Sequence, residues 1–92
     1  MDLSEKHLNI VKGVLEKYPY KFYVFGSRIK GKAKKLSDLD LCYKENISDS
    51  VISKIEEEFE NSDLPFKVEL VSYNRCADDF KKIIDNDLKE FS

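Results

Sequence analysis

Two acidic residues stand two positions apart at the start of an apolar segment. In a β-strand Asp38 and Asp40 share one face, while Leu39 and Leu41 point into the core. Two carboxylates at this separation repel each other, and a divalent cation between them removes that cost. Because all the ligand atoms are oxygens, the pair predicts a hard ion, Mg²⁺, with Mn²⁺ as the alternative.

A third carboxylate lies in a later apolar segment. Val68 and Leu70 take the core positions there, which puts Glu69 on the opposite face. Three acids on neighbouring strands can hold two metal ions, one that activates an attacking oxygen and one bound to the leaving phosphates. The spacing therefore predicts that Asp38, Asp40 and Glu69 form a two-metal site for phosphate chemistry.

A glycine turn and a basic stretch precede the acid pair. Gly26 has no Cβ and allows close backbone approach, and Ser27 adds a hydroxyl donor, so the pair suits phosphate groups. The basic side chains that follow are Arg28, Lys30, Lys32, Lys34 and Lys35. Arg28 is favoured as a phosphate ligand, whereas the lysines fit a solvated loop equally well.

The segments around these residues alternate between helical and strand patterns. Helical spacing of apolar residues predicts helices over Ser4–Tyr18, from Ser48 to a stop between Asn61 and Pro65, and over Ala77–Phe91. The expected strands are Lys21–Phe25, Leu39–Tyr43 and Phe66–Val71. The order α-β-β-α-β-α predicts an α/β (α+β) fold, a small mixed three-stranded sheet with helices on one face and the other face free for chemistry.

Length, charge and cysteine content narrow the class of protein. The 92 residues, 1–92, predict a single domain without room for a separate acceptor-binding lobe. Sixteen basic and eighteen acidic residues leave a net charge of -2, which argues against direct nucleic-acid binding. Two cysteines, and no apolar run that suits a membrane span or a signal segment, predict a cytoplasmic protein with no membrane contact.

The motif around the acid pair resembles the signature of the DNA polymerase β-like nucleotidyltransferases. Gly26-Ser27, followed by Ser37, Asp38 and Asp40, matches the pattern G-S-x9-S-D-x-D. The fuller string is similar to the minimal nucleotidyltransferases in particular, and it adds matches at Arg28, Gly31, Ala33 and Leu41. Length and element order extend the resemblance over nearly the whole chain, which implies a polymerase β-like core.

The resemblance also assigns roles to the site residues. It implies that Asp38 and Asp40 bind both metal ions and that Glu69 binds the catalytic ion, at a position where Asp is more usual. Gly26 and Ser27 would hold the triphosphate of ATP or another nucleoside triphosphate, and Arg28 and Ser37 belong to the same nucleotide-binding motif.

Partners follow from the resemblance as well. Minimal nucleotidyltransferases are often encoded with a HEPN-domain ribonuclease toxin as its antitoxin, and some transfer AMP to a tyrosine of that toxin. The leading interpretation is a nucleotidyltransferase that moves AMP from ATP to a hydroxyl of a HEPN-type partner protein. The alternatives are a non-catalytic antitoxin that acts by occlusion, and nucleotidylation of a small molecule such as an antibiotic. Acceptor, nucleotide preference and homo-oligomer formation stay open.

Overall fold

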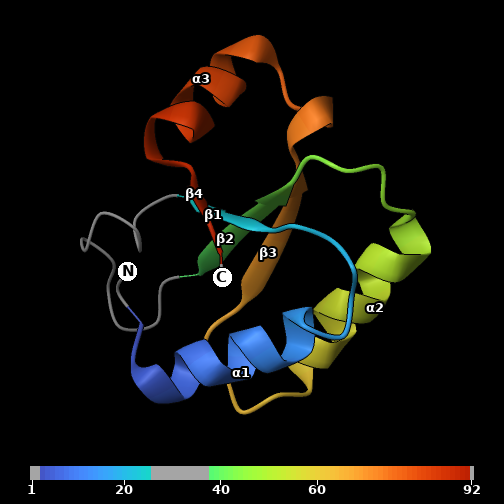
Figure 1. The fold of residues 1–92 in the computed structure, drawn as a ribbon, viewed down its shortest axis with the longest axis vertical. Coiled ribbons are helices and arrows are strands. Elements are labelled where there is room, and N and C mark those ends of the chain that lie inside the picture. The colour runs from blue at the N-terminus through green and yellow to red at the C-terminus, as the bar shows by residue number, and fades with distance from the viewer. Residues whose placement is uncertain (1–2, 26–37, 92) are drawn as a thin grey trace.

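A computed structural model describes residues 3–25 and 38–91 of the protein. Its helices and strands follow in the order α1 (Glu5–Leu15), β1 (Tyr23–Phe25), β2 (Leu39–Tyr43), α2 (Asp49–Glu60), β3 (Val68–Ser72), the 3₁₀ helix η1 (Tyr73–Arg75), α3 (Asp78–Asp87) and β4 (Lys89–Glu90) (Figure 1). The predicted strand Leu39–Tyr43 is confirmed at both ends, and the other predicted elements are found with shifted bounds.

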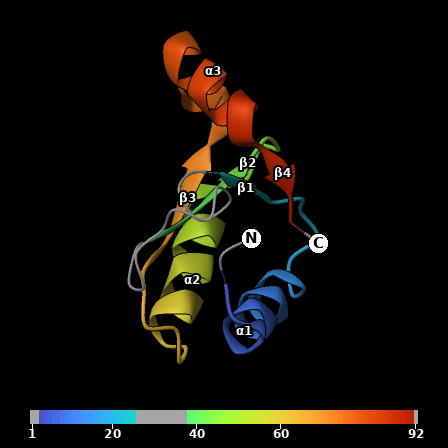
Figure 2. The same ribbon diagram turned by 90° about the vertical axis from the view of Figure 1, so that its left-hand side faces the viewer.

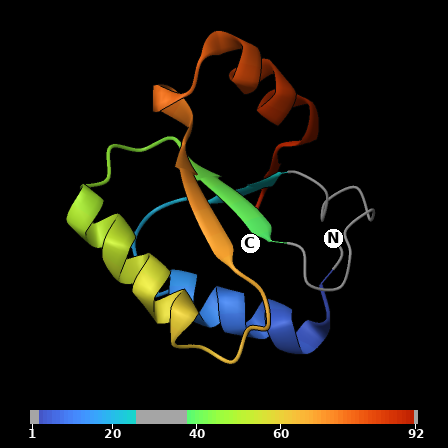
Figure 3. The same ribbon diagram turned by 180° about the vertical axis from the view of Figure 1, so that it is seen from behind.

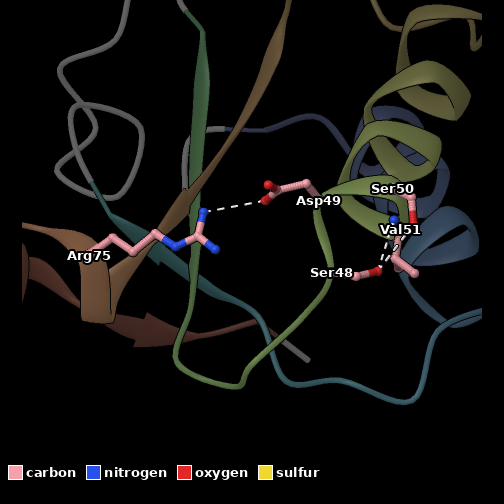
Figure 4. A network of polar contacts seen from close by, with 5 residues as sticks. All are labelled: Ser48, Asp49, Ser50, Val51 and Arg75. Carbon is pink, nitrogen blue, oxygen red and sulfur yellow. Dashed lines mark hydrogen bonds and ion pairs between the residues drawn. The ribbon is translucent and has the colours of Figure 1, made fainter.

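Serine hydroxyls cap the first two helices. Ser4 Oγ accepts a hydrogen bond from the His7 backbone N–H at 3.3 Å, and Ser48 Oγ accepts one from the Val51 N–H at 3.4 Å (Figure 4). Ser48, where the sequence predicts that the second helix begins, is the N-cap of α2. In each helix an acidic residue lies in the first turn, where it interacts favourably with the helix dipole.

The first helix is shorter than its apolar pattern suggested. The α-helix ends at Leu15, and the chain continues in tight turns in which Tyr18 N–H donates to Leu15 C=O at 3.1 Å. Pro19 follows directly and disfavours a helical conformation for the residue before it. Tyr18 and Lys17 then contact α2, because both donate hydrogen bonds to the carboxylate of Glu58.

The strands form one four-stranded sheet in the order β3-β2-β1-β4. β1 runs antiparallel to β2 and to β4, whereas β2 and β3 are parallel and are joined by the crossover helix α2. Figure 3 shows β2 (green) and β3 (orange) side by side, with both strands starting at the same end of the sheet. Arg75 lies in η1, which directly follows β3, and its Nη1 is 3.3 Å from Asp49 Oδ1 at the start of α2 (Figure 4). This ion pair links the end of β3 to α2.

One face of the sheet carries the main hydrophobic core under α1 and α2. Side chains with no exposed surface come from α1, α2 and the two central strands, and they are Val11, Val24, Leu39, Leu41 and Ile55. Burying such aliphatic side chains contributes about 1.5–3 kcal/mol each relative to leaving them in water. This face therefore supplies most of the driving force for folding.

The opposite face is partly covered by α3, which corrects the expectation that the helices would lie on one face only. Ile84 of α3 is fully buried against Phe25 and Cys42, and the sheet separates α3 from α1 and α2 (Figure 2). The physical reason is that β1 and β2 also bear apolar side chains on their second face. Those side chains need a cover, and α3 provides it over one end of that face.

The three-stranded sheet expected from the sequence is also corrected. α3 ends at Asp87, and Lys89 and Glu90 form β4 opposite Val24 and Tyr23 of β1. The pairing extends to Phe91, whose N–H donates to Phe22 C=O at 2.9 Å. A two-residue strand is too short to produce a periodic pattern, and Leu88 follows Ile84 at helical spacing, so the sequence favoured a longer helix.

In residues 3–25 and 38–91 no helix is long and apolar enough to cross a membrane.

Substitutions at two adjacent isoleucines of α3 test which side of this helix packs on the sheet. Ile84 is fully buried, whereas 60% of Ile83 is exposed. We expect Ile84→Ala to lower the free energy of unfolding by about 2–5 kcal/mol because it leaves a cavity under α3. Ile83→Ala is the matched control and should change it by less than about 0.5 kcal/mol. Urea denaturation followed by circular dichroism measures both, and equal effects would contradict the packing of α3 on this face.

Candidate active site

The strand register brings the predicted carboxylates together at one end of the sheet. Asp40 on β2 lies directly opposite Glu69 on β3 and opposite Phe25 on β1. Residues opposite one another in a sheet point to the same face, so the Asp40 and Glu69 side chains are neighbours. Asp38 is exposed, precedes β2 by one residue and shares the parity of Asp40. The predicted common face is therefore present for Asp40 and Glu69, and Asp38 lies near enough for its charge to act on Asp40.

The segment predicted to form the glycine turn begins directly after the end of β1 that lies beside Asp40. Phe25, the residue opposite Asp40, is followed directly by Gly26 and Ser27 in the sequence. Gly26, Ser27, Arg28 and Ser37, together with the basic stretch from Lys30 to Lys35, lie outside the residues that the structure describes. Their roles in nucleotide binding remain predictions.

Burial and neighbouring charge act together on Asp40. Its pKa is raised above the ordinary value for an aspartate, mainly because the half-buried carboxylate loses hydration, and further because of the charges of Glu69 and Asp38. The folded protein therefore holds a negative charge at a position where the fold disfavours it. Such a position stabilises a bound cation, since a cation removes the repulsion.

Lys67 is a neighbour of the acids that the sequence analysis did not single out. Its Nζ lies 3.5 Å from Glu69 Oε1, with both side chains well exposed to solvent. The two residues are two positions apart at the start of a strand, so the alternation that placed Glu69 could also have found Lys67. An exposed pair of this kind contributes little stability, and it holds Glu69 only loosely.

The fit of a metal ion depends on donor chemistry and on side-chain placement. Three carboxylates on one face are oxygen donors of the kind that Mg²⁺ prefers. Within residues 3–25 and 38–91, no group of three or more histidine, cysteine, aspartate or glutamate side chains is placed so that it could hold a metal ion. The donor chemistry therefore suits Mg²⁺, whereas the described side chains are not gathered around one ion position.

The remainder of this face is apolar and aromatic. Burial raises the pKa of the Cys42 thiol to about 11, so Cys42 is a neutral, unreactive side chain at pH 7. Lys44 Nζ lies 5.1 Å from the ring centre of Tyr23 and 4.8 Å from that of Tyr73, and the Tyr73 hydroxyl donates to Asp85 at 2.9 Å. These contacts lie where α3 packs on the sheet, and Asp40 lies two residues before Cys42 on the same face of β2.

Comparison with known families agrees with this geometry. The family model described as polymerase beta, nucleotidyltransferase matches residues 9–90. The chain belongs to the polymerase-β nucleotidyltransferase family. The resemblance inferred from residues 26–41 is thereby confirmed, and the protein is a nucleotidyltransferase. It is 40% identical over 88 residues to the probable protein adenylyltransferase MntA of Haemophilus influenzae (strain ATCC 51907 / DSM 11121 / KW20 / Rd). The match covers 91% of this chain and 77% of that relative.

Solved structures share the fold of this nucleotidyltransferase at low sequence identity. A crystal structure of a toxin–antitoxin with AMP-PNP superimposes with a TM-score of 0.71 and 19% identity, over 92% of this chain and 72% of that chain. Two mutant forms of the toxin–antitoxin MntA-HpeT give TM-scores of 0.64 and 0.62 at 16% and 14% identity. Each covers 98% of this chain, and the shares of the two solved chains are 72% and 73%. These likenesses establish the mixed α/β architecture.

The raised pKa of Asp40 predicts a pH-dependent effect on stability. Because the folded pKa lies above the unfolded value of about 3.9, the charged carboxylate destabilises the fold above that range. We expect Asp40→Asn to raise the melting temperature at pH 7 in the absence of divalent ions. The gain should shrink as the pH falls through the folded pKa of Asp40, and it should vanish below about 3.9, where the wild-type side chain is neutral.

The measurement is a series of thermal melts with chelator between pH 3 and pH 8. Asp63→Asn, at an exposed loop position, is the matched control and should show no such gain. A wild type that is more stable than Asp40→Asn at pH 7 would contradict the electrostatic strain inferred at this site.

Proposed function

We propose that this nucleotidyltransferase transfers AMP from ATP to a hydroxyl group of a partner protein and acts as the antitoxin to a HEPN-type toxin. The observation that carries the proposal is the register of Asp40 with Glu69, beside the strand end that leads into Gly26-Ser27. The 40% identity to a probable protein adenylyltransferase supports AMP as the group and a protein as the acceptor. The fold neighbours, which are toxin–antitoxin structures, support the partner class.

The carboxylates would hold two Mg²⁺ ions, with Mn²⁺ as a substitute, through Asp38, Asp40 and Glu69. When bound, the metal supplies charge neutralisation for the triphosphate and for the attacking oxygen. Gly26, Ser27, Arg28 and Ser37 would bind the triphosphate of ATP. The AMP-PNP in one fold neighbour supports a nucleoside triphosphate as the donor.

The transfer is a substitution at the α-phosphorus of ATP. The acceptor oxygen forms a bond to this phosphorus, and the bond from the phosphorus to the oxygen bridging the α- and β-phosphates breaks. Pyrophosphate leaves with the electron pair of the broken bond. The hydroxyl proton passes to the carboxylate of Asp38, Asp40 or Glu69. The products are an AMP ester on the partner protein and pyrophosphate.

The acceptor has to be positioned by the partner. Residues 3–25 and 38–91 form one sheet and its covering helices, without a second lobe to enclose an acceptor. Holding a hydroxyl in line with the α-phosphate removes several kcal/mol from the barrier, so turnover without the partner is expected to be slow.

The free thiols Cys42 and Cys76 fit a protein that works in the reducing cytoplasm.

Removal of two carboxylates tests the nucleotide site. We expect Asp38→Asn combined with Asp40→Asn to abolish Mg²⁺-dependent ATP binding, because the two side chains supply most of the negative charge that holds the metal. Calorimetric titration with ATP in Mg²⁺ and in chelator measures the effect. Asp63→Asn serves as the control with unchanged affinity, and Mg²⁺-dependent binding retained in the double mutant would exclude this site.

Labelled ATP tests the transfer. The protein is incubated with ATP labelled at the α-phosphate, with and without a candidate HEPN-type partner chain, and both chains are weighed by intact mass spectrometry. We expect one or more AMP additions on the partner, and none when Asp38→Asn replaces the wild type. Equal inhibition of the partner by wild type and Asp38→Asn, with no mass added, would instead establish occlusion.

A further inference from the structure

β3 forms one edge of the sheet in the described part of the chain, and its outer side pairs with no other strand there. It spans five residues, whereas β4 at the opposite edge spans two. Figure 3 shows β3 (orange) beside β2, with which it pairs. An open edge of this length is a template for a further extended segment, which adds to the sheet through main-chain hydrogen bonds.

The backbone groups that face outward can be identified from one hydrogen bond. Leu39 N–H donates to Lys67 C=O at 2.9 Å, so the backbone of Lys67 faces β2. Backbone groups alternate in direction along a strand, which turns those of Val68, Leu70 and Ser72 outward. Ser72 C=O already accepts from the Cys76 thiol at 3.2 Å. Val68 and Leu70 are left to bond a segment lying along this edge.

An acidic groove adjoins the start of this edge. The groove has a volume of about 1000 Å³ and lies between α2 and the segment leading into β3. Glu56, Glu57 and Glu60 line its α2 side, and Phe66 and Val68 line the strand side. Within residues 3–25 and 38–91 none of these three glutamates forms an ion pair. Lys67 also lines the strand side and forms an ion pair with Glu69, so three glutamates outweigh one lysine and the groove presents a net negative charge to whatever lies along β3.

Strand alternation links the groove to the carboxylates. A residue opposite Glu69 on an added strand would point to the face that bears Asp40 and Glu69, while its two neighbours would point to the α2 face. Strands lie about 4.8 Å apart, so that residue would stand about 5 Å from Glu69 and about 10 Å from Asp40. One extended segment can thus place a hydroxyl at the candidate active site and cationic side chains near Glu56 and Glu60.

We propose that the partner protein delivers its acceptor hydroxyl on an extended segment that pairs with the outer edge of β3, with lysine or arginine next to the hydroxyl residue. This inference rests on the proposed adenylyl transfer, and it deepens it by naming the docking surface and the chemistry of the acceptor. Main-chain bonds to Val68 and Leu70 supply the alignment, and the glutamates of α2 supply selectivity for basic neighbours.

Short peptides test the charge requirement with the full chain. The probes are acetyl-Val-Lys-Tyr-Lys-Val-amide and the same peptide with glutamate in place of both lysines, titrated into ¹⁵N-labelled protein. We expect the lysine peptide to bind at least about fivefold more tightly, as two partly exposed ion pairs would give, and to shift the amide signals of Val68 and Leu70. Replacing Glu56, Glu57 and Glu60 together by glutamine should remove the preference. Glu16→Gln, at an exposed residue outside the groove, should keep it.

Backbone methylation tests strand pairing independently of charge. Only one edge of the peptide can pair with β3, so N-methylation at alternate residues blocks pairing on one edge and spares it on the other. We expect the peptide methylated at both lysines and the peptide methylated at tyrosine to differ at least about tenfold in affinity, through the loss of about two hydrogen bonds. The weaker of the two reports whether the segment runs antiparallel or parallel to β3.

The outcomes separate this inference from the adenylyl transfer itself. Equal affinities of the two methylated peptides, no preference for lysine, or no shift at Val68 and Leu70 would overturn docking on β3, even if the protein adenylylates its partner. Edge-specific and lysine-selective binding supports the docking surface, even if the peptide gains no AMP. In the second case the docking surface stands, and the transfer reaction is the part that fails.

Discussion

The hydrogen-bonded register of β2 between β1 and β3 determines where every polar residue of the site can lie. Leu39 and Leu41 must enter the core under α1 and α2, because both are fully buried. That constraint turns Asp40 to the other face, and the parallel pairing with β3 sets Glu69 beside it. A slip of one residue would bury the carboxylate and expose the leucines. The energy of the main core therefore holds the acids in place, although the acids themselves repel one another.

The second face of the sheet carries an apolar cluster directly beside a charged carboxylate. α3 covers Phe25 and Cys42 with Ile84, while Asp40 lies at the uncovered end of the same strands. The nearby apolar packing removes water from the Asp40 carboxylate, which is the largest cause of its raised pKa. This resembles the general situation at functional sites, where local instability is maintained by stable surroundings.

Much of this arrangement could be predicted from the sequence, for identifiable reasons. Apolar alternation located Leu39–Tyr43 and the shared face of Asp40 and Glu69, and Ser48 marked the start of the second helix. The pattern could not reveal that α3 packs on the second face, since periodicity shows which stripe is apolar but not which surface it meets. β4 was missed because a two-residue strand depends on a partner distant in sequence. Metal and nucleotide ligation stay predictions, and Gly26, Ser27, Arg28 and Ser37 lie outside the described residues.

The pairing of β4 with β1 has a consequence for the order in which the protein folds. Val24 is hydrogen-bonded in register with Lys89, so this contact spans most of the chain and closes a long loop. During synthesis from the N-terminus, β1, β2 and β3 leave the exit tunnel of the ribosome before Lys89 does and can begin to pair around α1 and α2. Until then the outer edge of β1 is bare, and Phe25 and Cys42 lack the cover of α3. The half-finished sheet is thus open at both edges, which makes the nascent chain most prone to mispairing just before its last strand arrives.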